Sequence, residues 1–114
     1  MLDTVQLAQF DNSVAEDIQI LGLENIKHVH LDNTLLREKT PGEKRLSGVY
    51  SLGRSVNGHI GFREGNLPLI QDLRELAEAG YKEYVTVEIC QKGYWLEADR
   101  YAREAIDLIK GEFD

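Results

Sequence analysis

The sequence predicts an α/β fold with parallel strands, and three observations lead to this prediction. Residues 1–7, 26–32 and 84–90 show the apolar–polar alternation of β-strands. Segments with apolar residues at helical spacing follow these strands along the chain. Apart from residues 33–66 the connections are short, and regular alternation of this kind is typical of right-handed βαβ units around a parallel sheet.

The first strand, over 1–7, runs into a loop at 10–12, and a helix follows. Ser13 and Glu16 have the spacing of a capping box, in which two side chains satisfy the first backbone N–H groups of a helix. Gly22 ends the helix, because glycine adopts a positive φ without strain. The stripe that we expect to be buried consists of Val14, Ile18 and Leu21.

The second strand, over 26–32, has two faces of different chemistry. Val29 and Leu31 give one face that suits packing under a helix. The other face carries His28, His30 and Asp32. Imidazoles and carboxylates bind metals and transfer protons near neutral pH. This face therefore predicts the floor of an active site.

Residues 33–66 form a long glycine-rich segment that we expect to be an active-site loop. It holds six glycines and no sustained periodicity, and only Leu46–Leu52 suggests a short strand or helical turn. Its charged side chains sum to +3 in a chain of net charge −7. Such a basic loop would attract a small anionic ligand, although a solvated loop with incidental charges fits the pattern as well.

The rest of the chain repeats the alternation. Asn66 caps a helix that Gly80 ends, and the buried stripe is expected at Leu69, Leu73 and Leu76. In the strand over 84–90, Val85, Val87 and Ile89 share one face, and Thr86, Glu88 and Cys90 share the other. A final helix begins near Leu96 or Asp99. Its expected core residues are Ala98, Tyr101 or Ala102, Ala105, Leu108 and Ile109.

The overall composition narrows the class of protein. A chain of 114 residues suits a single domain, 1–114, and the acidic balance argues against nucleic acid as a partner. No apolar run is long enough for a membrane span, and the first residues lack the features of a signal peptide. A single cysteine, Cys90, allows no internal disulfide. We therefore expect a cytoplasmic protein.

The polar strand faces suggest where a metal would bind. If the aliphatic faces lie under helices, Glu88 points away from them and needs a partner or a cation. His30 and Glu88 would then lie near the carboxyl ends of neighbouring strands, with Asp3 as a third ligand. This donor set suits Mn, Mg, Zn or Co. The alternative is a hydrogen-bonded structural histidine and a solvent-exposed glutamate.

The sequence resembles the C-terminal part of xylose-isomerase-like TIM barrels, the sugar phosphate isomerase/epimerase superfamily that includes endonuclease IV. The similar stretches are HVHLD at 28–32, GHIGFREGNLP at 58–68 and AGYKEYVTVEI at 79–89, with LDTVQ at 2–6 similar to the sixth strand. The resemblance implies a partial barrel made of its sixth, seventh and eighth βα units. It also implies carbohydrate metabolism, with a sugar or sugar phosphate as the ligand.

Several residue roles follow from this resemblance. Asp3, His30 and Glu88 match divalent-metal ligands of the family, and Glu88 also matches a carboxylate that moves a proton between adjacent sugar carbons. Arg37 and, less directly, Arg54 match arginines that hold substrate hydroxyls or phosphate. Asp32 would hydrogen-bond a metal ligand or anchor a loop.

The chain also departs from the family pattern. The position three residues after the aspartate of the sixth strand is often histidine, whereas here it is Gln6, and the loop reads FREG at 62–65 where the family often has PGxG. The resemblance covers no counterpart of the first five βα units, which hold a further metal-binding glutamate. We therefore expect a truncated fragment, inactive alone, that forms a homodimer or docks on a complementing barrel half. The alternative is a non-catalytic remnant that binds metal or a small molecule.

Overall fold

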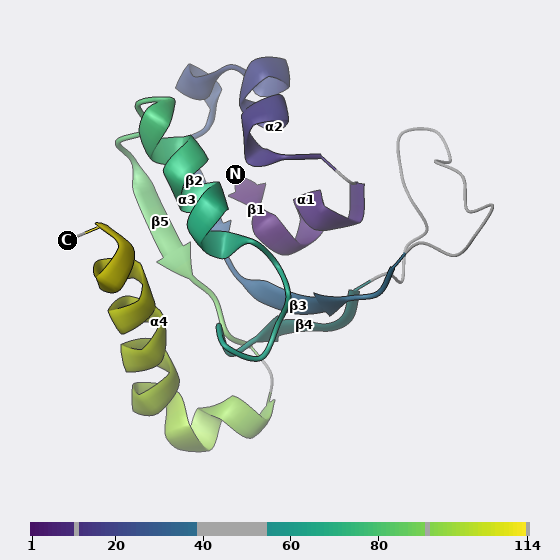
Figure 1. The fold of residues 1–114 in the computed structure, drawn as a ribbon, viewed down its shortest axis with the longest axis vertical. Helices are drawn as coiled ribbons and strands as arrows, with labels where there is room; N and C mark the ends of the chain where they lie inside the picture. The colour runs from purple at the N-terminus through teal and green to yellow at the C-terminus, as the bar shows by residue number, and fades with distance from the viewer. Residues whose placement is uncertain (11, 39–54, 91, 114) are drawn as a thin grey trace.

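A three-stranded parallel sheet forms the centre of the protein. The computed structural model describes residues 1–10, 12–38, 55–90 and 92–113. The sheet contains β1 (Leu2–Asp3), β2 (His28–Leu31) and β5 (Tyr84–Val87) in the spatial order β1-β2-β5, with both pairs parallel. Figure 1 shows these strands running side by side. The fold is thus α/β with a parallel sheet, as the alternation predicts.

Helices connect these strands along the chain. Among the described residues they are α1 (Thr4–Phe10), α2 (Val14–Leu21), α3 (Leu69–Glu78) and α4 (Ala98–Phe113), with short 3₁₀ helices at Leu23–Asn25 and Lys92–Glu97. None of the described helices is long and apolar enough to cross a membrane.

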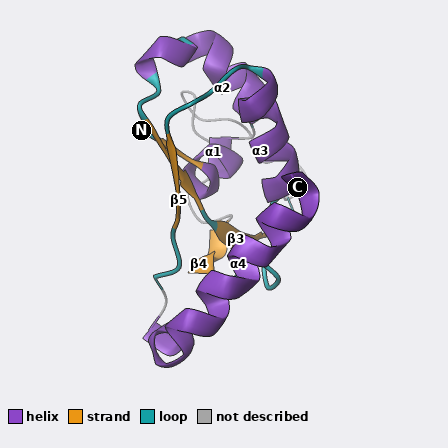
Figure 2. Ribbon diagram, turned by 90° about the vertical axis from the view of Figure 1, so that its left-hand side faces the viewer, coloured by secondary structure: helices purple, strands orange, loops and turns teal. Residues whose placement is uncertain are grey.

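The helices cover one face of the sheet. Val29 and Leu31 are fully buried there, against Leu76 of α3 and Ala105 of α4, respectively. Figure 2 shows α2, α3 and α4 on the same side of the sheet. Within the described part of the chain no helix lies on the opposite face, to which the alternation of β2 turns His28 and His30. A parallel sheet usually has both faces covered, so this open face is unusual.

The predicted first strand is wrong beyond Asp3. The chain turns into α1 at Thr4, and the Asp3 carboxylate accepts a hydrogen bond of 2.8 Å from the Gln6 backbone N–H. Asp3 therefore caps the first turn of α1 in the way that aspartate commonly begins a helix. Its spacing to Gln6 is that of a capping box, which outweighs the apolar alternation of residues 1–7.

The capping box of α2 is confirmed. The Ser13 side chain accepts from the Glu16 N–H (3.1 Å), and the Glu16 carboxylate accepts from the Ser13 N–H (2.7 Å). Gly22 follows the helix with a φ of 80°, which suits only glycine well. Val14 is buried as predicted, but Leu21 is 48% exposed because it ends the helix beyond the sheet.

The segment 33–66 was predicted as an irregular loop, and this is wrong at its two ends. β3 (Asn33–Leu36) and β4 (Ser55–Ile60) pair as an antiparallel hairpin with irregular register. The predicted short element at Leu46–Leu52 lies outside the described residues. The hairpin begins directly after β2, so it extends from the carboxyl end of the parallel sheet (Figure 1).

Asn33 holds the chain after the hairpin in place. Its side chain is buried and donates to the Phe62 carbonyl (2.8 Å), while its oxygen accepts from the backbone N–H groups of Thr34 (2.9 Å) and Leu67 (3.0 Å). The turn at 62–67 packs so closely that a Cβ on Gly65 would lie 2.3 Å from the Asn33 side chain. Only glycine fits at position 65 without a shift.

The predicted cap of α3 is also wrong. Asn66 exchanges two 2.9 Å hydrogen bonds with the Leu36 backbone, as a neighbouring strand would, and α3 begins at Leu69 after Pro68 without a side-chain cap. The buried residues of α3 are Leu69 and Leu76, with Leu73 packed beside them, as predicted. Gly80, with a φ of 86°, follows its end.

The core face of α4 is narrower than predicted. Ala105 is fully buried, and Tyr101, Leu108 and Ile109 are half-buried, whereas Ala98 and Ala102 are exposed. The exposed alanines line an apolar groove of about 290 Å³ beside β5, together with Trp95 and Ile106.

Candidate metal centre

Three predicted ligands meet at the carboxyl end of the parallel sheet. In the sheet Asp3 lies opposite His30, and His30 lies opposite Thr86. These three residues therefore occupy one row across the sheet. Glu88 follows β5, and its backbone N–H donates to the Leu31 carbonyl (3.1 Å). His30 Nδ1 lies 3.1 Å from Glu88 Oε2. Ligand atoms of Asp3, His30 and Glu88 all lie within 4.8 Å of one another, which is close enough to share one ion.

A second group of donors adjoins this one. His59 Nδ1 lies 3.5 Å from Glu88 Oε2, and the Cys90 thiol donates to Glu88 Oε1 (3.2 Å). The ligand atoms of His59, Glu88 and Cys90 also lie within 4.8 Å of one another. Glu88 therefore belongs to both groups.

Asp32 is a fully buried carboxylate below this cluster. Its Oδ1 accepts from the Thr4 hydroxyl (2.8 Å) and the Val5 N–H (3.2 Å), which fixes the start of α1 against the end of β2. Its Oδ2 lies 2.6 Å from His59 Nδ1. Neither of these two atoms has a hydrogen-bond partner among the described residues, despite their short separation. Asp32 thus anchors the start of α1 through Oδ1 and faces His59 through Oδ2.

Burial, hydrogen bonds and neighbouring charges shift the pKa values of the cluster residues in opposite directions. The hydrogen bond from Cys90, together with the charges of His59 and His30, lowers the pKa of Glu88, so Glu88 is ionised at neutral pH. Burial raises the pKa of Asp32 against the opposing hydrogen bond from Thr4. Desolvation and the hydrogen bond to Glu88 raise the pKa of the Cys90 thiol. Acidic groups crowded in this way repel one another, and a cation would relieve the repulsion.

The remaining predicted site residues lie apart from this cluster or outside the described chain. Arg37 follows β3 at the opposite end of that strand from Asn33, and its Nη1 donates to the Glu38 carbonyl (3.0 Å). Arg54 lies outside the described residues. Cys90, which was predicted to share a strand face with Glu88, is exposed and contacts Glu88.

His59 is a site residue that the sequence pattern does not predict. Its φ of 58° is positive, a conformation that histidine adopts more readily than most residues. The available signal was its chemistry: it is one of three histidines, and it stands between Gly58 and Gly61 next to Ile60. Only the antiparallel pairing of β4 with β3 brings it back to the end of β2.

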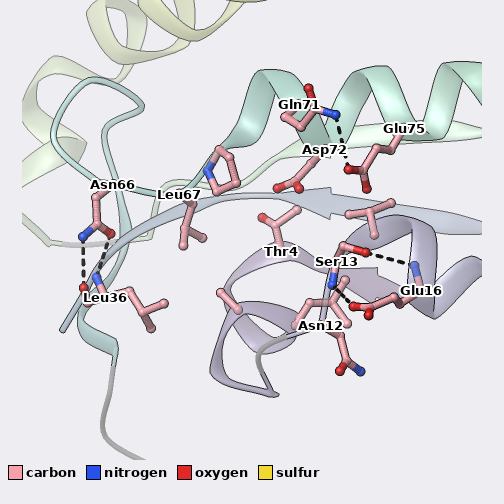
Figure 3. Close-up of a pocket in the computed structure, with 14 residues that line it drawn as sticks. Thr4, Asn12, Ser13, Glu16, Leu36, Asn66, Leu67, Gln71, Asp72 and Glu75 are labelled. Atoms are coloured by element: carbon pink, nitrogen blue, oxygen red, sulfur yellow. Dashed lines mark hydrogen bonds between the residues drawn. The ribbon is translucent and has the colours of Figure 1, made fainter. Parts of the chain in front are cut away.

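A separate polar pocket lies between α1, α2 and α3. It has a volume of about 440 Å³, and none of the metal-cluster residues lines it. Figure 3 shows the Asp72 carboxylate pointing from α3 into this pocket, toward Thr4. Burial, with a smaller contribution from Glu75, raises the pKa of Asp72 to about 7.

This shift makes stability depend on pH. The folded protein binds the Asp72 proton more tightly than the unfolded chain does, whose pKa is near the ordinary 3.8. Stability therefore falls as pH rises between about 4 and 7. We expect Asp72→Asn to stabilise the protein at about pH 8 by on the order of 1–3 kcal/mol, because partial solvent exposure reduces the full effect.

Thermal unfolding at about pH 5 and about pH 8 measures this effect. Asp107→Asn, at an exposed position of α4, is the control for the loss of one negative charge. An equal change in Tm for both variants at both pH values would contradict the assignment to the burial of Asp72.

A scan against protein-family models, a search of curated proteins and a search of solved structures each return no match to this chain. The resemblance to xylose-isomerase-like barrels therefore stays a prediction. The fold and the geometry of the cluster are the basis for assigning a function.

Proposed function

We propose that the chain forms the metal-binding end of a sugar isomerase or epimerase of the xylose-isomerase-like kind. In this proposal β1, β2 and β5 correspond to the last three strands of a (β/α)₈ barrel. The observation that carries it is the convergence of Asp3, His30 and Glu88 at the carboxyl ends of three adjacent parallel strands. Barrel enzymes hold their active sites at this end.

The donor set fits a divalent ion. One nitrogen and two carboxylates suit Mn, Mg, Zn or Co. The ion, when bound, would polarise the carbonyl and hydroxyl oxygens of a sugar. Asp3 and His30 are proposed to hold it through their side chains.

Glu88 is proposed to move the proton between adjacent sugar carbons. Its lowered pKa keeps it ionised, as a base must be, and its position beside the metal ligands brings it close to a bound substrate. Arg37 and Arg54 are the proposed contacts to sugar hydroxyls or phosphate. Gln6, at the position where the family often has histidine, is exposed and serves no proton-transfer role.

A binding module without turnover is the second candidate. The observation that favours it is the open face of the sheet, because an isomerase excludes water from its reacting centre and no described helix covers this face. Such a module would bind a metal or a small molecule at the same donors.

Proton exchange distinguishes the two functions. We expect the protein with Mn²⁺ in D₂O to incorporate deuterium into a ketose or ketose phosphate at the carbon beside the carbonyl, as followed by NMR. Conversion to the aldose should stay near background, because one acid/base residue exchanges a proton but isomerisation uses two.

Glu88→Gln should abolish the exchange, with the exposed Glu83→Gln as the matched control. Metal binding without exchange in the wild type would favour the binding module. Failure to bind any divalent ion would contradict the isomerase and a metal-binding module.

The open sheet also predicts self-association. β1 and β5 are the edge strands of the parallel sheet. Tyr84, which begins β5, is 81% exposed, and Trp95 and Leu96 in the following 3₁₀ helix are 67% and 92% exposed. Such edges and apolar side chains are typical of surfaces that a partner covers. We propose a second copy of the chain as that partner, with a complementing barrel half as the alternative.

Size-exclusion chromatography with light scattering should give twice the chain mass at micromolar concentration. Leu96→Glu should shift the equilibrium toward the monomer, whereas Glu24→Gln, in the 3₁₀ helix at Leu23–Asn25, should not. A wild-type protein that is folded and monomeric under these conditions would contradict the proposal.

A further inference from the structure

Further ligand side chains lie around Cys90, outside the first metal group. The Asp3/His30/Glu88 group leaves out three neighbouring ligand side chains, namely Asp32, His59 and Cys90. Asp32 is fully buried, and its Oδ2 lies 2.6 Å from His59 Nδ1. A buried carboxylate needs such a partner, so Asp32 holds the His59 ring in place beside Glu88 and Cys90.

The backbone holds these donors in fixed positions. The Cys90 N–H donates to the His59 carbonyl (3.0 Å), which ties the chain after β5 to the end of β4. The Glu88 N–H donates to the Leu31 carbonyl. Glu88 is therefore held at the carboxyl end of β2, where Asp32 follows Leu31 along the chain. Three donors from two segments thus meet, namely His59 of β4 and Glu88 and Cys90 after β5.

We propose that His59, Glu88 and Cys90 form a second divalent-cation site that prefers thiophilic ions. Glu88 lies between the two sites, as bridging carboxylates do in two-metal centres whose ions are roughly 3.5–4 Å apart. The site goes beyond the proposed sugar chemistry, although it shares Glu88 with the metal site of that function.

The donor types determine the preferred ion. One imidazole, one thiolate and one carboxylate give three of the four ligands of a tetrahedral Zn²⁺ site, and the sulfur disfavours Mg²⁺ and Ca²⁺. Binding would displace the Cys90 proton into solvent, because the ligand is the thiolate. The cation would also neutralise the acidic groups around it.

Cobalt provides a direct probe of the thiol. Co²⁺ titrated into the full chain under reducing conditions should produce sulfur-to-cobalt charge-transfer absorption in the near ultraviolet. Cys90→Ser should lose this band and weaken the second binding event at least tenfold, comparable to the loss of a metal-supporting group. Cys90 is exposed, so its substitution should leave the fold intact.

Asp3→Asn is the control that separates the two sites. It should weaken the first binding event and retain the band, because Asp3 is not among the proposed ligands of the second ion. Cobalt binding without a charge-transfer band, unchanged in Cys90→Ser, would overturn the second site and leave the proposed function standing. No cobalt binding by the wild type would overturn both.

Discussion

Glu88→Gln should lower the affinity of the protein for Mn²⁺ and Zn²⁺ by at least 100-fold. Glu88 is the one side chain shared by the two donor groups, with His30 Nδ1 at 3.1 Å and His59 Nδ1 at 3.5 Å from its Oε2. The substitution keeps the shape of the side chain and removes its charge. Each group would then lose its central anionic ligand.

Two measurements test this expectation. Isothermal titration calorimetry gives the affinity directly. Thermal unfolding gives it indirectly, because an ion at 100 times its Kd stabilises the folded state by about 2.7 kcal/mol, or roughly 10 °C in Tm for a domain of this size. Wild type should show this metal-dependent rise in Tm, and Glu88→Gln should lose most of it.

The Tm without metal should change less, because the Glu88 side chain is 30% exposed. Glu83→Gln, which makes the same change of charge at an exposed position before β5, is the matched control. Equally weak binding by wild type and Glu88→Gln would show that Glu88 is not a ligand.

Gly65→Ala should destabilise the protein by about 3 kcal/mol and lower Tm by roughly 11 °C. The new Cβ would lie 2.3 Å from the Asn33 side chain, which makes three hydrogen bonds in a buried setting. Moving that side chain leaves buried N–H and C=O groups without partners, and each such group costs about 1–3 kcal/mol. Metal affinity should fall far less, since the cluster ligands do not contact Gly65.

A double-mutant cycle with Asn33→Ala gives the sharpest test. If the clash with Asn33 is the cause, Gly65→Ala should cost little once the Asn33 side chain has been truncated. Gly111→Ala is the matched control, because a Cβ there meets nothing within 4 Å and alanine favours the interior of α4. It should stabilise by about 0.5–1 kcal/mol. Additive effects of the first pair would rule out the clash.

The sequence predicts the parts of the fold that local patterns determine. The alternation at β2 and β5 and the stripe of α3 report which side chains face the core, so the parallel sheet and its buried face follow from them. The prediction of a strand over 1–7 is wrong because the Asp3 carboxylate and the Gln6 N–H begin a helix, which the apolar alternation does not indicate. Asn66 does not cap α3, because its side chain is hydrogen-bonded to the backbone of Leu36, thirty residues earlier.

Local patterns also predict some residues of the candidate site and leave others out. Asp3, His30 and Glu88 are predictable because parallel strands bring equivalent positions to one edge. His59 and the exposed Cys90 depend on a non-local antiparallel pairing, β3 with β4, which no local pattern predicts. Arg37 and Arg54 rest on the resemblance, and the geometry of the cluster adds nothing to their role.

The neighbours Asp32 and Asn33 also have a consequence for the order of folding. Asp32 bonds Thr4 and Val5, about 28 positions earlier, whereas Asn33 bonds Phe62 and Leu67, about 30 positions later. Chain entropy opposes such distant contacts until other structure has shortened the loops. We expect the carboxyl end of the sheet to close after the transition state. Substitutions of Asp32 or Asn33 should then speed unfolding much more than they slow folding.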